Sequence, residues 1–227
     1  MNTETPLLGK VALVTGGARR IGAAICRELA ARGATVAVHY HHSEVEAIAQ
    51  TRVLGHGVFA LRGDVATPEG CDAIFQEVME WTGRLDILVN NAAVFEPDQA
   101  AADVLSCMYA VNVTAPLHLS ARLFENRREA CILHLLDQRI VSAPQEDGNF
   151  SAYVASKREL AASVGRLAKE YGPFLRVNGV SPGAVLAPEQ VREPAGPRIL
   201  GPRPTCEDVA DAVGFLARAS SITGQIL

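Results

Sequence analysis

The stretch that decides the fold is VALVTGGARRIG, residues 11–22 of a 227-residue chain. Its four leading apolar residues predict a buried strand, and Gly16, Gly17 and Gly22 mark a tight turn that opens into a helical pattern. Glycine allows the sharp turn and lets a pyrophosphate approach the free N–H groups of a helix N-terminus. The stretch therefore predicts a dinucleotide-binding turn, with a purely structural turn as the alternative.

Strands and helices alternate along the rest of the chain. Short apolar runs predict strands at residues 10–15, 34–40, 58–64, 85–91, 131–137 and 175–181. Their near-continuous apolar character is typical of strands covered on both faces. Apolar residues at helical spacing predict helices from Ile21 to Leu29 and over 44–54, 69–81, 99–124, 152–171 and 207–218. We therefore expect a single α/β domain over residues 1–227, with a doubly wound parallel sheet of six or seven strands flanked by helices.

Composition excludes several classes of protein. The chain is 48% hydrophobic and 20% charged with a formal net charge of −4, which leaves no basic surplus for binding nucleic-acid phosphates. Apolar runs such as 130–136 fall short of the roughly 20 residues that cross a bilayer, and Met1–Lys10 holds no apolar signal core. Five scattered cysteines form no Cys-x-x-Cys pair, so we interpret them as small buried residues. We expect a cytoplasmic protein that binds no nucleic acid, membrane or metal.

One long segment lacks a regular pattern. Residues 182–204 hold six of the 12 prolines together with Gly183, Gly196 and Gly201, a composition that is typical of a loop. Loops of this length inside a compact domain are usually functional. We therefore interpret 182–204 as a lid over the substrate.

The end of the second predicted strand bears on the choice of cofactor. An acidic residue there would bind the ribose hydroxyls of NAD and repel the 2′-phosphate of NADP. Residues 38–43 read VHYHHS, with no acid before Glu44. This pattern favours NADP(H), because donors and potential positive charge come from His41, His42, Ser43, Arg19 and Arg20. Two alternative interpretations of the histidines are a polar strand end without a ligand and an accidental metal cluster of His39, His41 and His42. The alternative for Ser43 is a helix N-cap with no role in cofactor binding.

Several short motifs then follow in order: Thr15-Gly16-x-x-x-x-x-Gly22, Asp64-Val65, Asn90-Asn91-Ala92-Ala93, Asn112, Tyr153-x-x-x-Lys157 and Ser181-Pro182-Gly183. This ordered set resembles the short-chain dehydrogenase/reductase family over essentially the whole chain. The resemblance implies a Rossmann-type fold and a tetramer paired through the helices at 99–124 and 152–171. It also implies cofactor contacts at Gly16, Arg19, Arg20, Ile21, Gly22, Asp64, Val65, Asn91, Ala92, Ala93, Tyr153, Lys157, Pro182 and Gly183, and a water path from Asn112 to Lys157.

The chemistry of Tyr153 and Lys157 can be argued from the residues alone. Reduction of a C=O or C=N bond needs a hydride and a proton, but a free tyrosine has a pKa near 10 and exchanges protons poorly at neutral pH. Residues four apart share a face of a helix, so the ammonium of Lys157 would favour the tyrosinate form of Tyr153. The alternative is an aromatic residue and a lysine on an ordinary amphipathic helix. Within the ordered motif set we interpret Tyr153, Lys157, Asp137 and Asn112 as the catalytic residues.

The family commonly carries a serine at the end of the fifth strand, where this chain has Asp137. With His39-Tyr40-His41-His42-Ser43 and the Phe95 that follows Asn90-Asn91-Ala92-Ala93-Val94, this aspartate resembles the pteridine reductase branch. There the residue matching Phe95 stacks a pterin on the nicotinamide, and the residue matching Arg20 contacts phosphate and pterin. The residue matching Asp137 assists protonation through the tyrosine. The resemblance thus implies substrate contacts at Phe95, Arg20, Asp137 and Tyr153.

The chain departs from that branch in three places. Asp137 precedes Tyr153 by 16 positions, three more than the usual interval, so residues 145–148 are expected to lengthen a loop at the site. His42 stands where the branch often has arginine, and the chain ends at Leu227, before the family's usual last strand and Asp-Gly-Gly segment.

The leading hypothesis is an NADPH-dependent reductase of a pteridine or dihydrofolate-like C=N bond. The alternatives are a carbonyl or alcohol oxidoreductase of the same family and an NADP(H)-binding regulatory protein without turnover.

Overall fold

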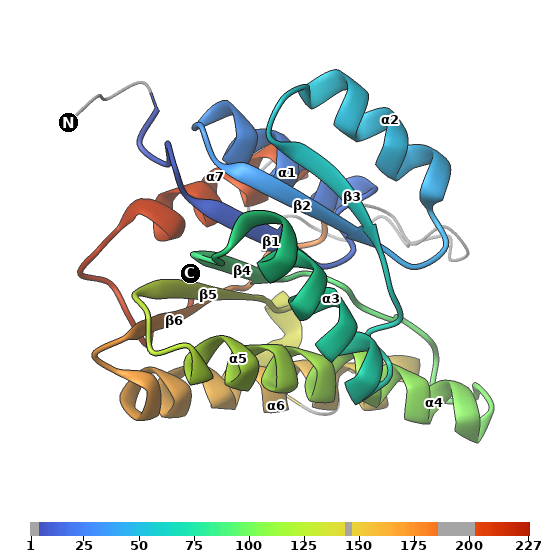
Figure 1. The fold of residues 1–227 in the computed structure, drawn as a ribbon. Helices are drawn as coiled ribbons and strands as arrows, with labels where there is room; N and C mark the ends of the chain where they lie inside the picture. Colours follow the sequence, from blue (N-terminus) through green and yellow to red (C-terminus); the bar gives the residue numbers. More distant parts are fainter. Residues whose placement is uncertain (1–4, 144–146, 186–202) are drawn as a thin grey trace.

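The computed structural model describes residues 5–143, 147–185 and 203–227. Its centre is a parallel sheet of six strands in the order β3-β2-β1-β4-β5-β6 (Figure 1). The strands are β1 (Val11–Val14), β2 (Thr35–Tyr40), β3 (Val58–Arg62), β4 (Ile87–Asn90), β5 (Ala130–Leu135) and β6 (Leu175–Val180). Beyond β6, Ile226 forms an isolated parallel bridge with Gly179. The doubly wound α/β fold predicted from the sequence is confirmed.

Helices cover both faces of the sheet. α1 (Arg20–Ala31), α2 (Glu44–Leu54) and α7 (Cys206–Arg218) pack into one apolar cluster, and α3 (Pro68–Thr82), α5 (Ala115–Glu125) and α6 (Ser151–Tyr171) pack into another. Figure 1 shows these two groups on opposite sides of the strands. Thr67 and Thr205 cap α3 and α7, since each side chain accepts a hydrogen bond from a backbone N–H of its helix.

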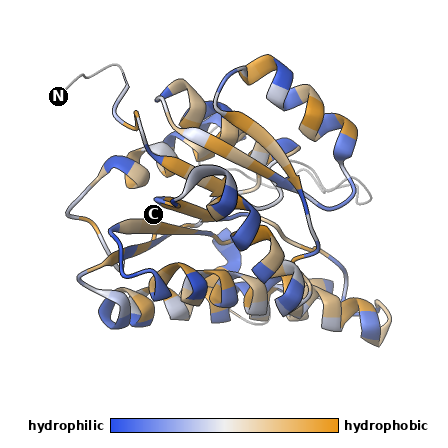
Figure 2. Cartoon of the chain, in the orientation of Figure 1, coloured by the Kyte–Doolittle hydropathy of each residue, from blue (hydrophilic) through white to orange (hydrophobic). Residues whose placement is uncertain are grey.

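Each strand supplies side chains to both clusters. Ala12 and Val14 of β1 lie in the cluster of α1 and α7, whereas Val11 and Leu13 lie in the cluster of α3 and α5. This alternation follows from the two-residue period of a strand. It explains why the strands are apolar along most of their length in Figure 2 while the helices carry apolar and polar sides.

The strand order reverses between β1 and β4. The chain runs from β1 through β2 to β3 on one side of this point and from β4 through β5 to β6 on the other. The loops that leave the carboxyl ends of β1 and β4 therefore diverge, and ligands of such folds bind in the crevice between them.

The helix predicted over 99–124 is interrupted. α4 (Ala102–Tyr109) passes into a π-helical turn (Ala110–Thr114) before α5 begins. Pro116 has no N–H, so it cannot donate to the carbonyl of Asn112 as the α-helical ladder requires, and the N–H of Ala115 instead bonds Ala110. The prediction of one regular helix was wrong at this turn, which carries a predicted site residue.

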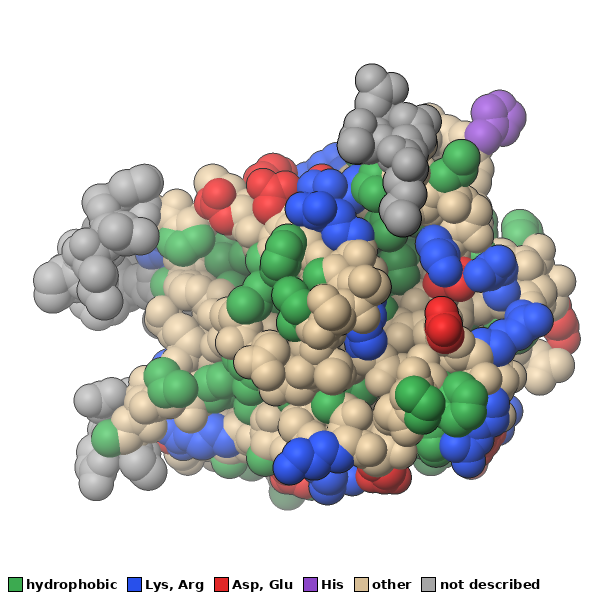
Figure 3. All heavy atoms as spheres, turned by 90° about the vertical axis from the view of Figure 1, so that its left-hand side faces the viewer, with side chains coloured by type: hydrophobic (Ala, Val, Ile, Leu, Met, Phe, Trp, Pro, Cys, Tyr) green, Lys and Arg blue, Asp and Glu red, His purple; other side chains and the backbone are tan. Residues whose placement is uncertain are grey.

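Three features considered in the sequence analysis can be compared with the structure: the cysteines, the length of apolar runs and the distribution of surface charge. Cys26, Cys71 and Cys131 are buried as expected, but Cys206 is only partly buried and Cys107 is exposed. The expectation that apolar runs are too short to cross a membrane was wrong for Ala102–Glu125, which is long and apolar enough by composition. Its Leu119 and Leu123 lie in the protein core. On the face in Figure 3, basic side chains lie beside acidic ones and form no continuous basic patch.

Candidate active site

The loops that follow β1 and β4 are joined through Thr15. Its Oγ1 donates to Val89 O at 3.3 Å and accepts from the N–H groups of Asn91 and Ala92, each at 3.0 Å. The amide of Asn91 returns two hydrogen bonds, to the carbonyls of Thr15 at 2.9 Å and Gly16 at 3.0 Å. The predicted cofactor residues Gly16, Asn91 and Ala92 therefore form one rigid unit, and Ala93 follows it directly.

The glycine turn brings backbone segments closer together than side chains would allow. Gly16 has a φ of +61°, and a Cβ on Gly22 would lie 2.1 Å from Gly16 O. Arg19, the N-cap of α1, makes no side-chain capping bond, so the first turn of α1 presents its N–H groups at this turn. Ile21 lies half-buried beside Gly22. An uncapped helix N-terminus behind such a close backbone approach fits the pyrophosphate of a dinucleotide.

His39 belongs to the support of this turn. It is 2% exposed; its Nδ1 accepts from Gly16 N–H at 3.1 Å, so its Nε2 carries the hydrogen that is donated to Gly63 O at 3.2 Å. Burial lowers its pKa to about 4. Both ring nitrogens are engaged, which removes His39 from the alternative of a histidine metal cluster. Gln50, which the sequence analysis missed, adds a bond to Gly17 O at 2.8 Å, and its only sequence signal is a polar residue on a buried helix face.

The residues after β2 are more open. His41 and His42 are exposed, with ring centroids 3.7 Å apart. Ser43 occupies the N-cap position of α2 without a side-chain capping bond. Arg19 is exposed and lies 3.9 Å from Glu46, while Arg20, also exposed, has a φ of +54°. These donors lie at the end of β2 and the start of α1, and their assignment to the 2′-phosphate of the cofactor stays a prediction.

Four further residues expected to contact the cofactor follow β3 and β6. Asp64 follows β3 and accepts from Ala66 N–H at 2.9 Å, and Val65 is buried beside it. Pro182 follows β6, and its carbonyl accepts from Gln138 N–H at 3.1 Å. A Cβ on Gly183 would lie 3.4 Å from the Gln138 side chain. Most of the predicted lid lies outside the described residues, at 186–202.

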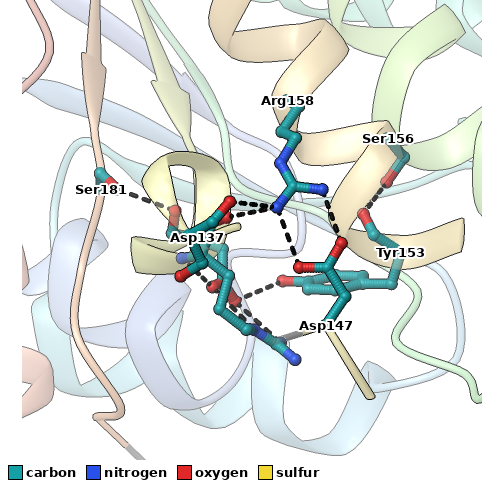
Figure 4. A network of polar contacts seen from close by, with 8 residues as sticks. Asp137, Asp147, Tyr153, Ser156, Arg158 and Ser181 are labelled. Atoms are coloured by element: carbon teal, nitrogen blue, oxygen red, sulfur yellow. Dashed lines mark hydrogen bonds and ion pairs between the residues drawn. The ribbon is translucent and has the colours of Figure 1, made fainter. Parts of the chain in front are cut away.

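Tyr153 and Asp137 meet at the carboxyl end of β5. The Tyr153 hydroxyl donates to Asp137 Oδ2 at 3.2 Å (Figure 4). Burial, and then the charge of Asp137, raises the pKa of Tyr153 well above its ordinary value. This direction is opposite to the one expected from Lys157 alone. At neutral pH the hydroxyl is therefore protonated and held by a carboxylate.

Lys157 lies one helical turn after Tyr153 and is 3% exposed. Its Nζ donates to Leu135 O at 2.9 Å and lies 5.9 Å from the centre of the Tyr153 ring. Burial lowers its pKa to about 8, while the charge of Asp137 acts in the opposite sense. The ammonium therefore stays mostly charged at neutral pH, at the base of the site.

Asn112 braces the site from the π-helical turn. Its Oδ1 accepts from Val94 N–H and its Nδ2 donates to Val94 O, both at 2.9 Å. The same amide reaches Ser156 Oγ at 3.1 Å, and Ser156 donates to Tyr153 O at 2.6 Å. Asn112 thus fixes the loop that carries Phe95, and the water path to Lys157 stays a prediction.

Phe95 lies in an aromatic group beside Tyr153. Its ring stacks on Phe150 at 4.4 Å and meets the Tyr153 ring edge-on at 4.7 Å. The guanidinium of Arg139 lies 5.5 Å from the Phe95 ring. The structure therefore brings together Phe95, Asp137 and Tyr153 of the predicted substrate residues, whereas Arg20 comes from the glycine turn.

The sequence analysis missed three charged residues around Asp137. Arg139 pairs with Asp137 through Nε at 3.1 Å and Nη2 at 3.2 Å. Arg158 binds the buried Asp147 through both guanidinium ends, at 2.6 and 2.9 Å. The only signals for two of them in the sequence were their positions: Arg158 adjoins Lys157, and Asp147 lies in the lengthened interval between Asp137 and Tyr153.

Comparisons with known proteins agree with this geometry. The short chain dehydrogenase family profile matches residues 10–196. The chain is similar to the solved structure of a short chain dehydrogenase from Burkholderia cenocepacia in complex with NADP, at 33% identity and a TM-score of 0.89, covering 98% of this chain and 96% of the other. It is 31% identical to a cyclohexanol dehydrogenase from Rhodococcus over 100% of this chain and 97% of the relative. It is 30% identical to a hydroxynaphthalene reductase from Aspergillus fumigatus over 81% of this chain and 69% of the relative. With most of its length matched, the chain belongs to the short-chain dehydrogenase family and is an oxidoreductase.

Proposed function

We propose that the protein is an NADP(H)-dependent reductase. The glycine turn and the uncapped start of α1 accommodate a pyrophosphate, and the end of β2 offers His41, His42 and Ser43 without an acidic residue. The similar Burkholderia structure contains NADP. NADPH, when bound, supplies the hydride. The affinity ratio of NADPH to NADH tests this choice, and His42→Arg should increase affinity for NADPH without changing affinity for NADH.

The observation that carries the proposal is the hydrogen bond from Tyr153 to Asp137. The raised pKa keeps the Tyr153 hydroxyl protonated at neutral pH, so the proton that reduction of a C=O or C=N bond requires is present at the site. Because a raised pKa also makes the hydroxyl a weaker acid, the transfer needs a nearby cation to stabilise the tyrosinate. In the reduction, Tyr153 would give its proton to the substrate heteroatom. The ammonium of Lys157, 5.9 Å from the ring, would then stabilise the tyrosinate that remains.

A pteridine or dihydrofolate-like compound is the substrate we propose. When substrate takes the Tyr153 hydroxyl, Asp137 loses one hydrogen-bond donor and keeps those of Arg139, so the freed position on Oδ2 can accept a hydrogen bond from a donor on the substrate. A pteridine ring carries several N–H donors beside its reducible C=N bonds, whereas a simple ketone carries none. The aromatic group of Phe95 and Phe150 also suits a flat heteroaromatic ring.

A ring ketone or alcohol is the second candidate. Two similar proteins are named for such compounds, hydroxynaphthalene and cyclohexanol. Here Asp137 would only hold Tyr153 in place.

Oxidation of NADPH with dihydrobiopterin, dihydrofolate and cyclohexanone in parallel separates the candidates. Asp137→Ser should cripple pterin reduction and spare ketone reduction. Tight NADPH binding without turnover across this panel and a wider set of carbonyl compounds would instead favour the regulatory alternative.

We also propose that the protein forms a homotetramer through α4, α5 and α6. Tyr109 on α4 is 45% exposed and bonds Glu159 on α6 at 2.6 Å, so the two helices already form one continuous surface. Light scattering after size-exclusion chromatography would give the mass of the assembly directly.

A further inference from the structure

Arg139 lies against the catalytic pair, and the proposed reaction gives it no role so far. Its guanidinium and its backbone N–H, the latter at 2.9 Å, hold the Asp137 carboxylate at both oxygens. Its Cζ also lies 5.3 Å from the Tyr153 ring and 5.9 Å from the Phe150 ring. One arginine therefore touches the acceptor of the Tyr153 hydrogen bond and the aromatic surroundings of the donor.

The segment that carries Arg139 is itself anchored. It is a short 3-10 turn, Gln138–Val141, and Arg158 donates to the carbonyls of Arg139 at 3.2 Å and Ser142 at 2.8 Å. Asp147, which is 4% exposed, holds Arg158 in place. Figure 4 shows Arg158 lying between Asp147 and the backbone of this turn. From the opposite side, Ser181 Oγ donates to Asp137 O at 2.9 Å.

The ionisable groups that face Asp137 come from two elements. The 3-10 turn supplies Arg139, and α6 supplies the ammonium of Lys157 and the neutral hydroxyl of Tyr153. From the segment before α6, the charge of Asp147 acts on Arg139 rather than on Asp137, and Arg158 pairs with Asp147. Burial alone would raise the pKa of Asp137, but the hydrogen bonds from Arg139 outweigh burial and hold that pKa below its usual value. Without Arg139, only the ammonium of Lys157 would oppose the charge of the carboxylate that Tyr153 faces.

We propose that Arg139 is a positioning residue: it fixes Asp137 as the hydrogen-bond acceptor of Tyr153 and balances its charge, so that the tyrosine is oriented yet still able to release its proton. The kinetic part of this inference rests on the proposed reductase function. The electrostatic part does not, because it concerns the protein without substrate.

Carboxyl carbon NMR titration tests the electrostatic part without any turnover. The Asp137 resonance, assigned through Asp137→Asn, should titrate below the ordinary aspartate pKa of about 3.9 in the wild type. In Arg139→Gln it should move up by about one pKa unit or more, and in Arg139→Lys by less, because lysine keeps the charge but loses the two-point contact. Arg166→Gln, which removes an exposed arginine from the same helix as Tyr153, should leave it unchanged. If the pKa of Asp137 is the same in the wild type and in Arg139→Gln, the inference is wrong. If Arg139→Gln does not fold, Arg139→Lys provides the same comparison.

The pH profile of kcat/KM tests the kinetic part. Loss of Arg139 should move the acid limb of the profile to higher pH by about one unit. At pH values below the new limb, kcat/KM should therefore be about tenfold lower than in the wild type. Arg139→Lys should recover part of this loss. An equal loss at every pH would mean that Arg139 only supports the fold, and the inference would fail. A shifted Asp137 titration with no turnover of any substrate would contradict the proposed function and leave the electrostatic pairing standing.

Discussion

Replacing Gly22 by alanine should weaken cofactor binding more than it weakens the fold. The added Cβ would lie 2.1 Å from Gly16 O and 2.6 Å from Asn91 Nδ2, far inside ordinary contact distance. Relief requires movement of Gly16, whose φ of +61° and bond to Asn91 define the turn. Overpacking of this kind costs about 1–3 kcal/mol. If the free protein relieves the clash by moving Gly16 and NADPH requires the original turn, binding must restore the clash. NADPH affinity then falls by about 5-fold to 150-fold.

The assay is a titration of NADPH followed by nicotinamide fluorescence, with a thermal melt of each variant alone. Gly165→Ala is the matched control, because Gly165 also lies in a helix but a Cβ there meets nothing within 4 Å. That control should bind NADPH like the wild type and be more stable by up to about 1 kcal/mol. Wild-type affinity in Gly22→Ala would refute the assignment of this turn to the pyrophosphate.

Three further predictions address other parts of the molecule. Tyr153→Phe should lower kcat by about 10²- to 10⁴-fold while the dissociation constant of NADPH stays within a few-fold, because only the proton donor is lost; a normal kcat would rule out Tyr153 as the acid. His39 and His134 are buried with pKa values lowered to about 4 and about 3, so the unfolded chain binds more protons between these values and pH 6.5. The free energy of unfolding should therefore fall by roughly 2 kcal/mol per histidine from pH 7 to pH 5, and urea titrations should show a smaller fall in His134→Gln. Asp147→Asn should cost about 2–3 kcal/mol in the same assay, because it leaves the Arg158 guanidinium without its carboxylate; unchanged stability would mean that this pair does not anchor the loop.

The layers of the fold could be predicted because apolar runs carry most of the information. A strand such as β2, buried from Val36 to Tyr40, needs apolar residues on both faces, and that requirement is visible without any neighbour. The glycine turn was equally visible, since Gly16 and Gly22 are required by local backbone geometry. The π-helical turn at Asn112 was not, because its cause, the missing N–H of Pro116, also occurs in helices that stay regular.

Roles that depend on tertiary partners could not be predicted. The sequence offered His39 as a member of an accidental metal cluster, but its partners Gly16 and Gly63 follow two different strands. The pKa of Tyr153 was expected to fall because Lys157 shares its helix face, yet burial and Asp137 raise it. In both cases the deciding contact comes from a segment whose distance in space the sequence does not state.

The aspartate at position 137 and the longer interval to Tyr153 are best understood as one unit. A carboxylate in place of the family's serine adds a negative charge beside the proton donor, and that charge raises the pKa of Tyr153. The cation that compensates it, Arg139, is two residues away and needs a fixed backbone. Arg158 supplies that support only because Asp147, inside the longer interval, holds its guanidinium. It follows that Asp137→Ser alone leaves Arg139 unpaired, so its effect on pterin and ketone reduction should be compared with that of the double variant Asp137→Ser/Arg139→Gln, in which the local charge is balanced again.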